Sequence, residues 1–279
     1  MNWKTYPINP CFSMLSFHSL FVAEKESSYR FPGETHDFWE CVVVLRGSIC
    51  ASDNECVYHL ATGDMILHRP MALHKFHVTD PGGARLLIFS FSATESLLHF
   101  FTQYAFHMTH EQIGITDRIL RYMQAHLPEN VPNDPWQHME ALLTQPDVCD
   151  RLSVFVRELL LCCSRSGSDT LIAVNPETQV FGQAVKTMQS QPREWLTIEE
   201  IARHCHISAT QLKRIFTKYS SLSVHKYYLK LKLAVAAQLL RDGLPVSEIA
   251  EQLGFSSANY FSTVYRRETG MSPTSYREL

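Results

Sequence analysis

Two segments near the carboxyl end, over about residues 209–219 and 257–268, carry the side chains best suited to chemistry. Each has apolar residues at helical spacing on one face, while the opposite face holds small, amide and basic side chains and no acid. In a DNA major groove Arg can pair with guanine, Asn with adenine, and Thr or Ala can contact the thymine methyl group. A merely solvated helix face, the alternative, would be expected to mix Glu with Lys. We therefore expect base contacts from Ala209, Thr210, Lys213, Arg214, Ala258, Asn259, Ser262 and Thr263.

Further polar residues on the same two segments suit the DNA backbone rather than the base edges. Hydroxyl and cationic side chains bind phosphate oxygens, and such contacts position a protein on the duplex without reading its sequence. The residues expected to contact phosphates are Thr217, Lys218, Arg266 and Arg267.

The two segments lie in a tandem repeat, which predicts two structural units of the same kind. The motif Glu-Ile-Ala at 200–202 recurs at 248–250, an offset of 48 residues. In each copy a short helix, a tight turn and a second helix follow one another, which is the pattern of a helix-turn-helix unit. The repeat therefore predicts two such units in the last hundred or so residues.

Local signals predict where the helices of these units begin. Thr197 and Glu200 form a capping box, which begins the first helix of the first copy. Gly254 suits the turn of the second copy because glycine tolerates positive φ. Ser208 and Ser256 are the expected N-caps of the second helices.

One long helix is expected between the two copies, over Val224–Arg241, with basic residues at Lys226, Lys230 and Lys232. Such a helix would fix the spacing of the two units. Successive major grooves on one face of DNA lie about 34 Å apart. One chain could therefore read both grooves, bending the DNA if its own spacing is shorter.

The first 177 residues differ from the rest in charge and in pattern. They hold 12 Lys and Arg against 20 Asp and Glu, a net charge of −8, whereas the remainder holds 13 against 8, a net charge of +5. This asymmetry is expected when only the second part meets phosphate. Short strands separated by turn signals predict a small β-barrel or sandwich over about 11–92. The expected strands are Phe17–Val22, Trp39–Leu45, Gly47–Ala51, Met65–His68 and Arg85–Phe91.

After residue 92 the apolar spacing becomes helical, which predicts helices near 94–106, 116–126 and 147–163. An apolar stripe on the last one suits either the core or a dimer seam, and comprises Val148, Leu152, Phe155, Val156, Leu159 and Leu160. The stretch SRSGS at 164–168 is typical of a linker. The expected organisation is a first domain over 1–163 (barrel about 11–92, helices about 94–163), a linker over 164–177 and a second domain over 178–279.

The stretch SEIAEQLGFSSANYFSTVYRRETGMSPTSYRE resembles the carboxyl-terminal signature of the AraC/XylS-type family of bacterial transcription regulators. The resemblance covers about residues 180–279 closely and the front half more loosely. The first copy departs from the pattern, with Ser221 opposite Gly270 and His206 opposite Gly254. The resemblance implies an α+β fold: an N-terminal cupin-like β-barrel followed by helices, then an all-α domain of two helix-turn-helix units joined by a long helix.

The stretches THDFWECVVVLRGS and LATGDMILHRPMALHKF make the front half similar to the cupin-like sensor domain of that family. The effector pocket that this implies includes His36, Trp39, Glu40 and His74. Glu34, His36, Glu40 and His74 also approximate a cupin metal-ligand pattern and would suit a divalent transition metal. Alternation would place residues 34, 36 and 40 on one face of an extended segment. Metal binding, polar contacts with an effector and a structural role remain alternatives.

The sequence therefore predicts a DNA-binding transcription regulator, an activator by family analogy, that responds to a small molecule such as a carbohydrate. Its expected partners are double-stranded DNA, the effector, RNA polymerase and a second copy of the chain. The chain shows no signal-peptide pattern and no long apolar run, which predicts a cytoplasmic protein without membrane contact. One alternative is a metal-dependent cupin enzyme with a DNA-binding appendage, although phosphate-loop and hydrolase motifs are absent from the sequence. Another is a constitutive regulator whose barrel serves only oligomerisation.

Overall fold

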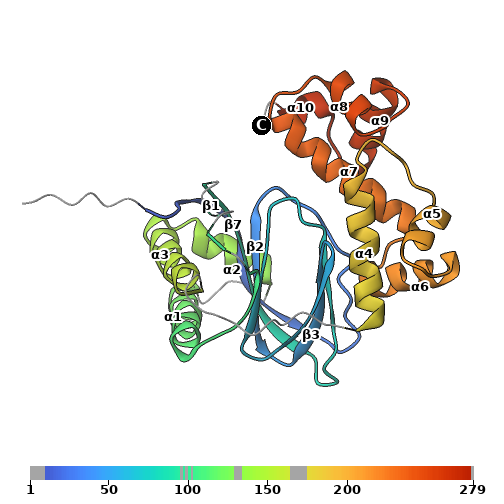
Figure 1. The fold of residues 1–279 in the computed structure, drawn as a ribbon. Helices are drawn as coiled ribbons and strands as arrows, with labels where there is room; N and C mark the ends of the chain where they lie inside the picture. Colours follow the sequence, from blue (N-terminus) through green and yellow to red (C-terminus); the bar gives the residue numbers. More distant parts are fainter. Residues whose placement is uncertain are drawn as a thin grey trace, which may run out of the picture.

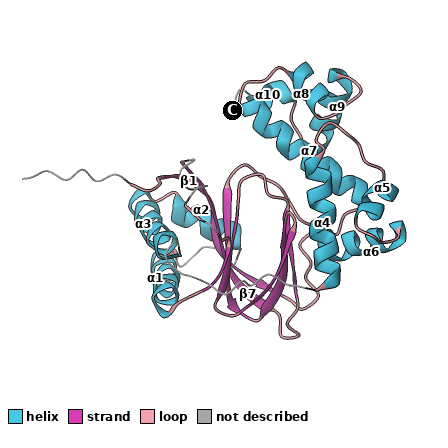
Figure 2. Ribbon diagram, viewed as in Figure 1, coloured by secondary structure: helices cyan, strands magenta, loops and turns pink. Residues whose placement is uncertain are grey.

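The computed structural model describes residues 10–94, 97, 100–101, 103–128, 134–163 and 175–277. Figure 1 shows a β-barrel in the middle, the helices that follow it in the chain on one side and the carboxyl-terminal helices on the other. Strands are confined to the first part of the chain, and the described residues after 107 are helices and loops (Figure 2). The arrangement is the α+β fold expected from the sequence.

Two antiparallel sheets form the barrel. Its strands are β1 (Met14–Lys25), β2 (Trp39–Arg46), β3 (Ser48–Asp53), β4 (Cys56–Ala61), β5 (Asp64–His68), β6 (His74–Val78), β7 (Ala84–Ala93) and β8 (Ala105–His107). The larger sheet has the order β1-β7-β2-β5-β8 and the smaller one the order β4-β3-β6. All five expected strands are present, whereas β4, β6 and β8 were not expected.

Successive side chains of β2 serve two different cores because strand residues alternate between the faces of a sheet. Val42 and Val44 are buried in the space between the two sheets. Cys41 and Val43 point the other way, into the core that the sheet forms with the helices. The register pairs Glu40 with His68 of β5, which brings two polar side chains to one end of the barrel.

Helices α1 (His110–His126), α2 (Pro135–Leu143) and α3 (Pro146–Cys163) follow the barrel. The helix expected near 94–106 is wrong in its described part, because Ala105 lies in β8 and pairs with Ile66 of β5. Residues 95–96, 98–99 and 102 lie outside the described residues. Apolar residues such as Phe101 are buried against the larger sheet, so their spacing reflects packing rather than helical periodicity.

The apolar stripe of α3 belongs to the core of the chain. All six of its residues are buried, together with side chains of the larger sheet such as Leu20 and Phe89. The dimer-seam interpretation of this stripe is therefore wrong, since burial within one chain leaves none of these side chains for a partner.

The second part of the chain is helical throughout its described residues. Its helices are α4 (Pro176–Ser190), α5 (Ile198–His204), α6 (Ala209–Ser220), α7 (Val224–Arg241), α8 (Val246–Gln252), α9 (Ala258–Thr269) and α10 (Pro273–Arg277). Helix α4 begins with an Asn175 cap, so the end of the expected 164–177 linker is already helical. Residues 164–174 of that linker lie outside the described residues.

The two helix-turn-helix units are α5 with α6 and α8 with α9. Thr197 and Ser208 cap their helices as expected, and α7 has the expected bounds. The expected N-cap at Ser256 is wrong: Ser257 caps α9 by accepting a hydrogen bond from the backbone N–H of Tyr260. Both serines precede the helix, and the one whose hydroxyl reaches the third helical N–H is the cap.

The two copies share a backbone geometry that their sequences only partly share. Gly254 and Gly270 have φ values of 69° and 85°, and their counterparts His206 and Ser221 have φ values of 56° and 54°. All four residues are therefore in the left-handed region. The first copy adopts it without glycine, at a cost of about 1–2 kcal/mol per residue.

Helix α7 is shared by the cores of both units. Tyr227, Tyr228 and Leu231 pack in the first core, and Leu233 and Leu240 pack in the second. One helix therefore fixes how the two units are oriented relative to each other.

Lys232 of α7 is buried and joins three segments of the second domain. Its ammonium donates hydrogen bonds to the carbonyl oxygens of Pro192 (2.5 Å), Glu194 (2.8 Å) and Leu253 (3.1 Å). It also lies 4.6 Å from the centre of the Trp195 ring. Lys232, expected only as a basic residue along the helix, is thus a structural cross-link.

The barrel packs directly on the second domain. Lys75 of β6 donates to the Lys218 carbonyl (3.2 Å) and to the Ser221 hydroxyl (2.8 Å), at the end of α6. The Tyr227 hydroxyl of α7 donates to the Asn54 carbonyl at 2.9 Å, in the β3–β4 turn. Apolar residues of the barrel, including Val57, are buried in the core of the first unit. These contacts hold the sensor side and the helical side in one arrangement.

Among the described residues, no helix combines the length and the apolar character that crossing a membrane requires.

The left-handed turns predict opposite effects for two substitutions. Gly254→Ala should lower the free energy of unfolding by more than about 2 kcal/mol, because a Cβ there would overlap the Arg193 carbonyl oxygen. His206→Gly should raise it by up to about 1 kcal/mol, since it removes left-handed strain while adding unfolded-state entropy. Urea denaturation of both variants measures these changes. Equal effects of the two substitutions would contradict the shared turn geometry.

Candidate DNA interface and sensor site

The outer faces of α6 and α9 present the residues expected to contact DNA bases. Thr210, Lys213 and Arg214 are exposed on α6, as are Asn259 and Thr263 on α9. The half-buried members of the set are Ala209, Ala258 and Ser262. The expected phosphate contacts are likewise exposed: Thr217, Lys218, Arg266 and Arg267. The structure therefore places all twelve residues on the two second helices, with apolar residues turned inward.

An acidic residue lies on part of this surface, which the sequence did not predict. Glu177, in the first turn of α4, forms ion pairs with Arg214 (2.7 Å) and Lys218 (2.5 Å). The hydrogen bond from Lys218 lowers the pKa of Glu177, and the same bond raises the pKa of Lys218. Two cations expected to contact DNA are thus already paired with a carboxylate. Glu177 lies 37 positions before Arg214 and 41 before Lys218 in the sequence, so no local signal could reveal the contact.

Two exposed residues of the reading faces were also missed by the sequence reasoning. Tyr260 has 55% of its surface exposed near the start of α9. Gln211 occupies the corresponding position of α6 and is exposed too. The available signal was the apolar stripe itself, because Gln211 and Tyr260 do not belong to the buried sets of α6 and α9.

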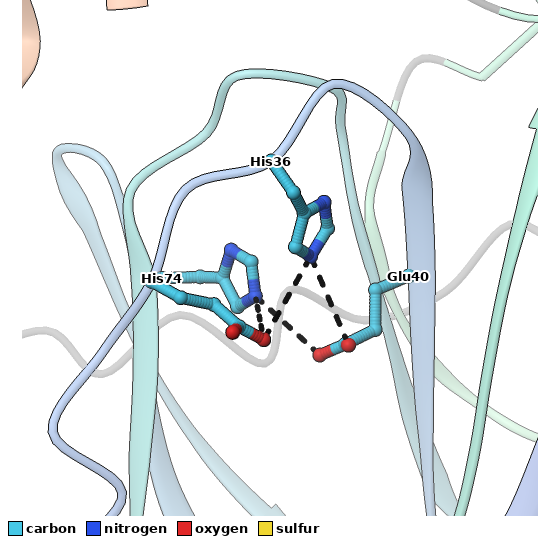
Figure 3. Close-up of side chains that lie close together, drawn as sticks. His36, Glu40 and His74 are labelled. Atoms are coloured by element: carbon cyan, nitrogen blue, oxygen red, sulfur yellow. Dashed lines mark ion pairs between the residues drawn. The ribbon is translucent and has the colours of Figure 1, made fainter. Parts of the chain in front are cut away.

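A cluster of four ionisable side chains lies at one end of the barrel. Glu34, His36, Glu40 and His74 each offer a ligand atom, and these atoms lie within 4.8 Å of one another. The Nε2 atoms of the two histidines face the carboxylate oxygens at 3.4–3.9 Å. Figure 3 shows the two imidazoles and Glu40 converging from different segments of the chain. The four residues expected to gather here are therefore brought together.

Backbone hydrogen bonds hold the segments of the cluster in place. Glu34 and His74 exchange two of them, at 3.0 and 3.1 Å, which adds residue 34 to the edge of β6. The Met71 N–H donates to the His36 carbonyl at 2.7 Å. Met71 itself is in the left-handed region, with φ 65°, and such strain in a non-glycine residue is concentrated at functional sites.

The charges in the cluster depend on one another. Burial opposes ionisation of Glu40, yet the neighbouring imidazoles of His36 and His74 hold its pKa below the usual range. Burial likewise opposes the charged form of His74, but Glu40 raises its pKa. Burial and the charge of Glu40 raise the pKa of Glu34. Behind them, burial and the charge on His74 lower the pKa of His68, which lies 2.7 Å from Asp53.

The cluster lies beside a cavity of about 260 Å³ between the barrel and the second domain. Thr35 and His36 line it from the barrel, and Lys230, Tyr265 and Glu268 line it from α7 and α9. A second cavity of about 330 Å³ lies along the same helix. Both cavities are bounded by Met71 and Ala234. A molecule bound at this end of the barrel would therefore contact both domains.

Trp39 does not join the expected pocket. It is 2% exposed and lies in the core between the larger sheet and the helices. Because it precedes Glu40 in β2, its side chain points to the opposite face of the sheet. The prediction that Trp39 lies in one pocket with His36, Glu40 and His74 was wrong, because neighbouring strand residues face opposite sides of the sheet.

Two family descriptions match the chain. An AraC-like ligand binding domain matches residues 17–104, and a helix-turn-helix domain matches residues 201–279. The HTH-type transcriptional activator RhaR of Mannheimia succiniciproducens is 24% identical, over 94% of this chain and 96% of its own. The Msm operon regulatory protein of Streptococcus mutans is 25% identical, over 91% and 88%.

Two solved structures are also similar to the chain or to part of it. ToxT from Vibrio cholerae, bound to an unsaturated fatty acid, covers 98% of this chain and 97% of its own at 14% identity, with a TM-score of 0.40. An AraC-type regulator from Chromobacterium violaceum is 35% identical over 34% of this chain and 87% of its own, with a TM-score of 0.34.

A ligand-binding barrel followed by two helix-turn-helix units defines the class of the protein, which is a DNA-binding transcription regulator with a sensor domain. The two matched regions stand in that order and together span more than half of the chain. The chain belongs to the AraC family of transcription regulators.

The ion pairs of Glu177 predict that replacing this residue increases the affinity for DNA. Glu177→Gln should tighten binding to duplex DNA about two- to fivefold at low salt, because Arg214 and Lys218 would no longer be paired with a carboxylate. Fluorescence anisotropy at several salt concentrations measures the gain, which should shrink as salt rises. Glu111→Gln, an exposed acid on α1, is the matched control. Unchanged or weaker binding by the Glu177 variant would show that the pairing does not limit DNA binding.

Proposed function

We propose that this protein activates transcription in response to a small polar effector, of the carbohydrate class, bound at the end of the barrel. The observation that carries the proposal is the shared cavity, which His36 lines from the barrel and Lys230 lines from α7. A ligand shifts an equilibrium between two domain arrangements only through different affinity for them. A cavity with walls in both domains provides that difference, since separating the domains would remove half of the contacts.

The relatives support the activator, and the side chains of the site support the effector class. One of them is named a transcriptional activator and another an operon regulatory protein. The imidazoles and carboxylates around His36 and Glu40 offer donors and acceptors that suit hydroxyl groups. An effector rich in hydroxyls fits these groups better than an apolar one.

We also propose how the chain engages its macromolecular partners. Helices α6 and α9 enter successive major grooves. Arg214, Asn259 and their neighbours contact bases, and Lys218 and Arg267 contact phosphates. The protein works as a homodimer in the cytoplasm, where it contacts both its operator and RNA polymerase. Sedimentation with and without operator DNA tests the dimer.

The four-residue cluster also favours a second candidate, a metal-dependent barrel enzyme carrying a DNA-binding domain. We propose that the chain is not an enzyme, because its relatives are transcription regulators throughout their length. Turnover of a substrate by the metal-loaded chain would favour the enzyme.

Selection of bound sequences from a random DNA pool tests the regulator. The full chain should recover two sequence blocks about one helical turn apart. Arg214→Ala should blur one block and cost about 1–3 kcal/mol of binding, because a bidentate base contact is lost. Lys218→Ala, a phosphate contact on the same helix, should weaken binding to all sequences alike.

Recovery of no motif, together with weak binding that disappears at moderate salt, would leave only nonspecific phosphate attraction. That result would contradict sequence-specific regulation by the chain in the conditions tested. A motif that remains sharp in both blocks of the Arg214 variant would contradict the assigned base contact alone.

The packing of the barrel on the second domain predicts the effect of removing one cation. Lys75→Met should loosen the contact with α6, because two hydrogen bonds from a buried ammonium are lost. Hydrogen exchange should become faster in the β3–β4 turn and at the end of α6. Lys226→Met, an exposed lysine on α7, is the control. Unaltered exchange in the Lys75 variant would show that these bonds do not hold the domains together.

A further inference from the structure

Two buried imidazole nitrogens at the end of the barrel have no hydrogen-bond partner among the described residues, namely Nε2 of His36 and Nε2 of His74. The His74 side chain is only 2% exposed. In both rings the other nitrogen faces a backbone carbonyl: Nδ1 of His36 lies 2.9 Å from the Phe38 oxygen, and Nδ1 of His74 lies 3.0 Å from the Ala72 oxygen. A carbonyl oxygen only accepts hydrogen bonds, so each neutral ring carries its proton on Nδ1 and presents a lone pair at Nε2.

These lone pairs point toward groups that also present lone pairs. The Glu40 oxygens lie 3.8 Å from Nε2 of His36 and 3.4 Å from Nε2 of His74, and a Glu34 oxygen lies 3.9 Å from both. Four electron-pair donors aimed at one point repel each other unless a cation lies among them. Protonation of both rings would not satisfy them either, because Nε2 of His36 lies 3.8–3.9 Å from the carboxylate oxygens, which is too far for a hydrogen bond.

The spacing and the donor types fit a metal ion. With metal–ligand bonds of about 2.0–2.2 Å, neighbouring ligand atoms around one ion lie roughly 3–3.6 Å apart. The histidine–carboxylate separations are 3.4–3.9 Å, and all four ligand atoms lie within 4.8 Å of one another. The ligand atoms would therefore have to draw closer around an ion, and the Glu34 carboxylate, which is 47% exposed, has the room to do so. Two imidazoles with two carboxylates suit divalent first-row transition metals better than calcium or magnesium, which prefer oxygen ligands alone.

The backbone carbonyls and the ring that contact the two histidines are of the kinds that hold metal ligands in other proteins. A ligating histidine commonly donates its second ring N–H to a backbone carbonyl, which fixes the ring and its tautomer. Both rings have that contact here. The His68 ring stacks on His74 with centroids 4.2 Å apart, which further fixes the orientation of His74.

We infer that Glu34, His36, Glu40 and His74 bind one divalent first-row transition metal ion. The inference rests on the proposed function and names a ligand of its sensor domain. Because His36 also lines the cavity between the domains, the ion would present an open position to the oxygen atoms of an effector there. Metal binding would thus join the barrel, through the effector, to Lys230 and α7.

Metal titration of the full chain tests the inference. The protein is first stripped with a chelator and dialysed, then titrated with Co²⁺ and, separately, with Zn²⁺. We expect one ion per chain by equilibrium dialysis with elemental analysis, and visible absorption bands of bound Co²⁺. Glu34→Gln and His36→Gln should each weaken binding by more than about tenfold, as even substitutions behind the ligands commonly do.

Matched variants separate the site from surface binding. Glu26→Gln and His59→Gln alter an exposed carboxylate and an exposed imidazole of the same domain and should leave affinity and stoichiometry unchanged. Thermal unfolding checks that each variant folds. Should His36→Gln fail to fold, Glu34→Gln still decides the matter, because its side chain is half-exposed.

Absence of stoichiometric binding, or equal binding by the wild-type chain and the Glu34 variant, would overturn the metal site. DNA selection on the same preparations keeps the two proposals apart. A recovered DNA motif without metal binding refutes the metal site and leaves the regulator standing. Stoichiometric metal that depends on Glu34, without any DNA motif, supports the metal site and counts against the regulator.

Discussion

Helix α7 has to satisfy three surfaces at once, and most of the structure depends on that constraint. One face packs in the first helix-turn-helix core through Leu231, another packs in the second through Leu233, and a third bounds the cavities beside the barrel through Ala234. Each face recurs at helical spacing. Leu231 and Leu233 lie where two faces meet, so each packs in a core and also lines a cavity. The buried Lys232 then ties the helix to the segment at 192–194 and to the end of α8. Since three carbonyl oxygens share this one ammonium, any shift of α7 breaks hydrogen bonds in two places.

In this arrangement the barrel contacts the helical domain away from the residues that are expected to contact DNA bases. The contacts from Lys75 and Asn54 end at the carboxyl end of α6 and on α7, whereas the exposed reading residues lie nearer the start of each second helix. A change at the barrel would therefore reach the packing of α6 and α7 before it reached the residues proposed to contact bases. Interfaces of packed side chains switch between discrete arrangements rather than deform smoothly. Val57 of the barrel is buried in the core of the first unit, so the contact between the two domains consists in part of packed side chains.

The two helix-turn-helix units and α7 were predicted closely because their signals are local, whereas α4 and α10 were not predicted. Capping at Thr197 and Ser208 and the apolar spacing of α7 lie within a few residues of the structure they specify. The barrel was predicted less completely. Strand β6 was missed because its burial pattern does not alternate, since it faces the barrel on one side and the second domain on the other. Glu177 and Lys75 act across long sequence separations, so no local pattern could have revealed their partners.

The sequence predicted the four residues of the cluster at the end of the barrel, but the reason given for their convergence was incomplete. Strict alternation over 34–40 was expected to align the side chains, yet residues 35–38 form no strand and Glu34 is held by a bridge to His74. The convergence comes from two backbone attachments, of Glu34 to β6 and of His36 to Met71. These attachments hold the loop over the end of the barrel. Met71 is then in the left-handed region, and Nε2 of His36 and Nε2 of His74 have no hydrogen-bond partner among the described residues. Such a cluster lowers the free energy of unfolding, because a buried polar group without a hydrogen-bond partner is destabilising. Sites that combine backbone strain with unsatisfied buried polar groups are where a function is expected to offset the cost.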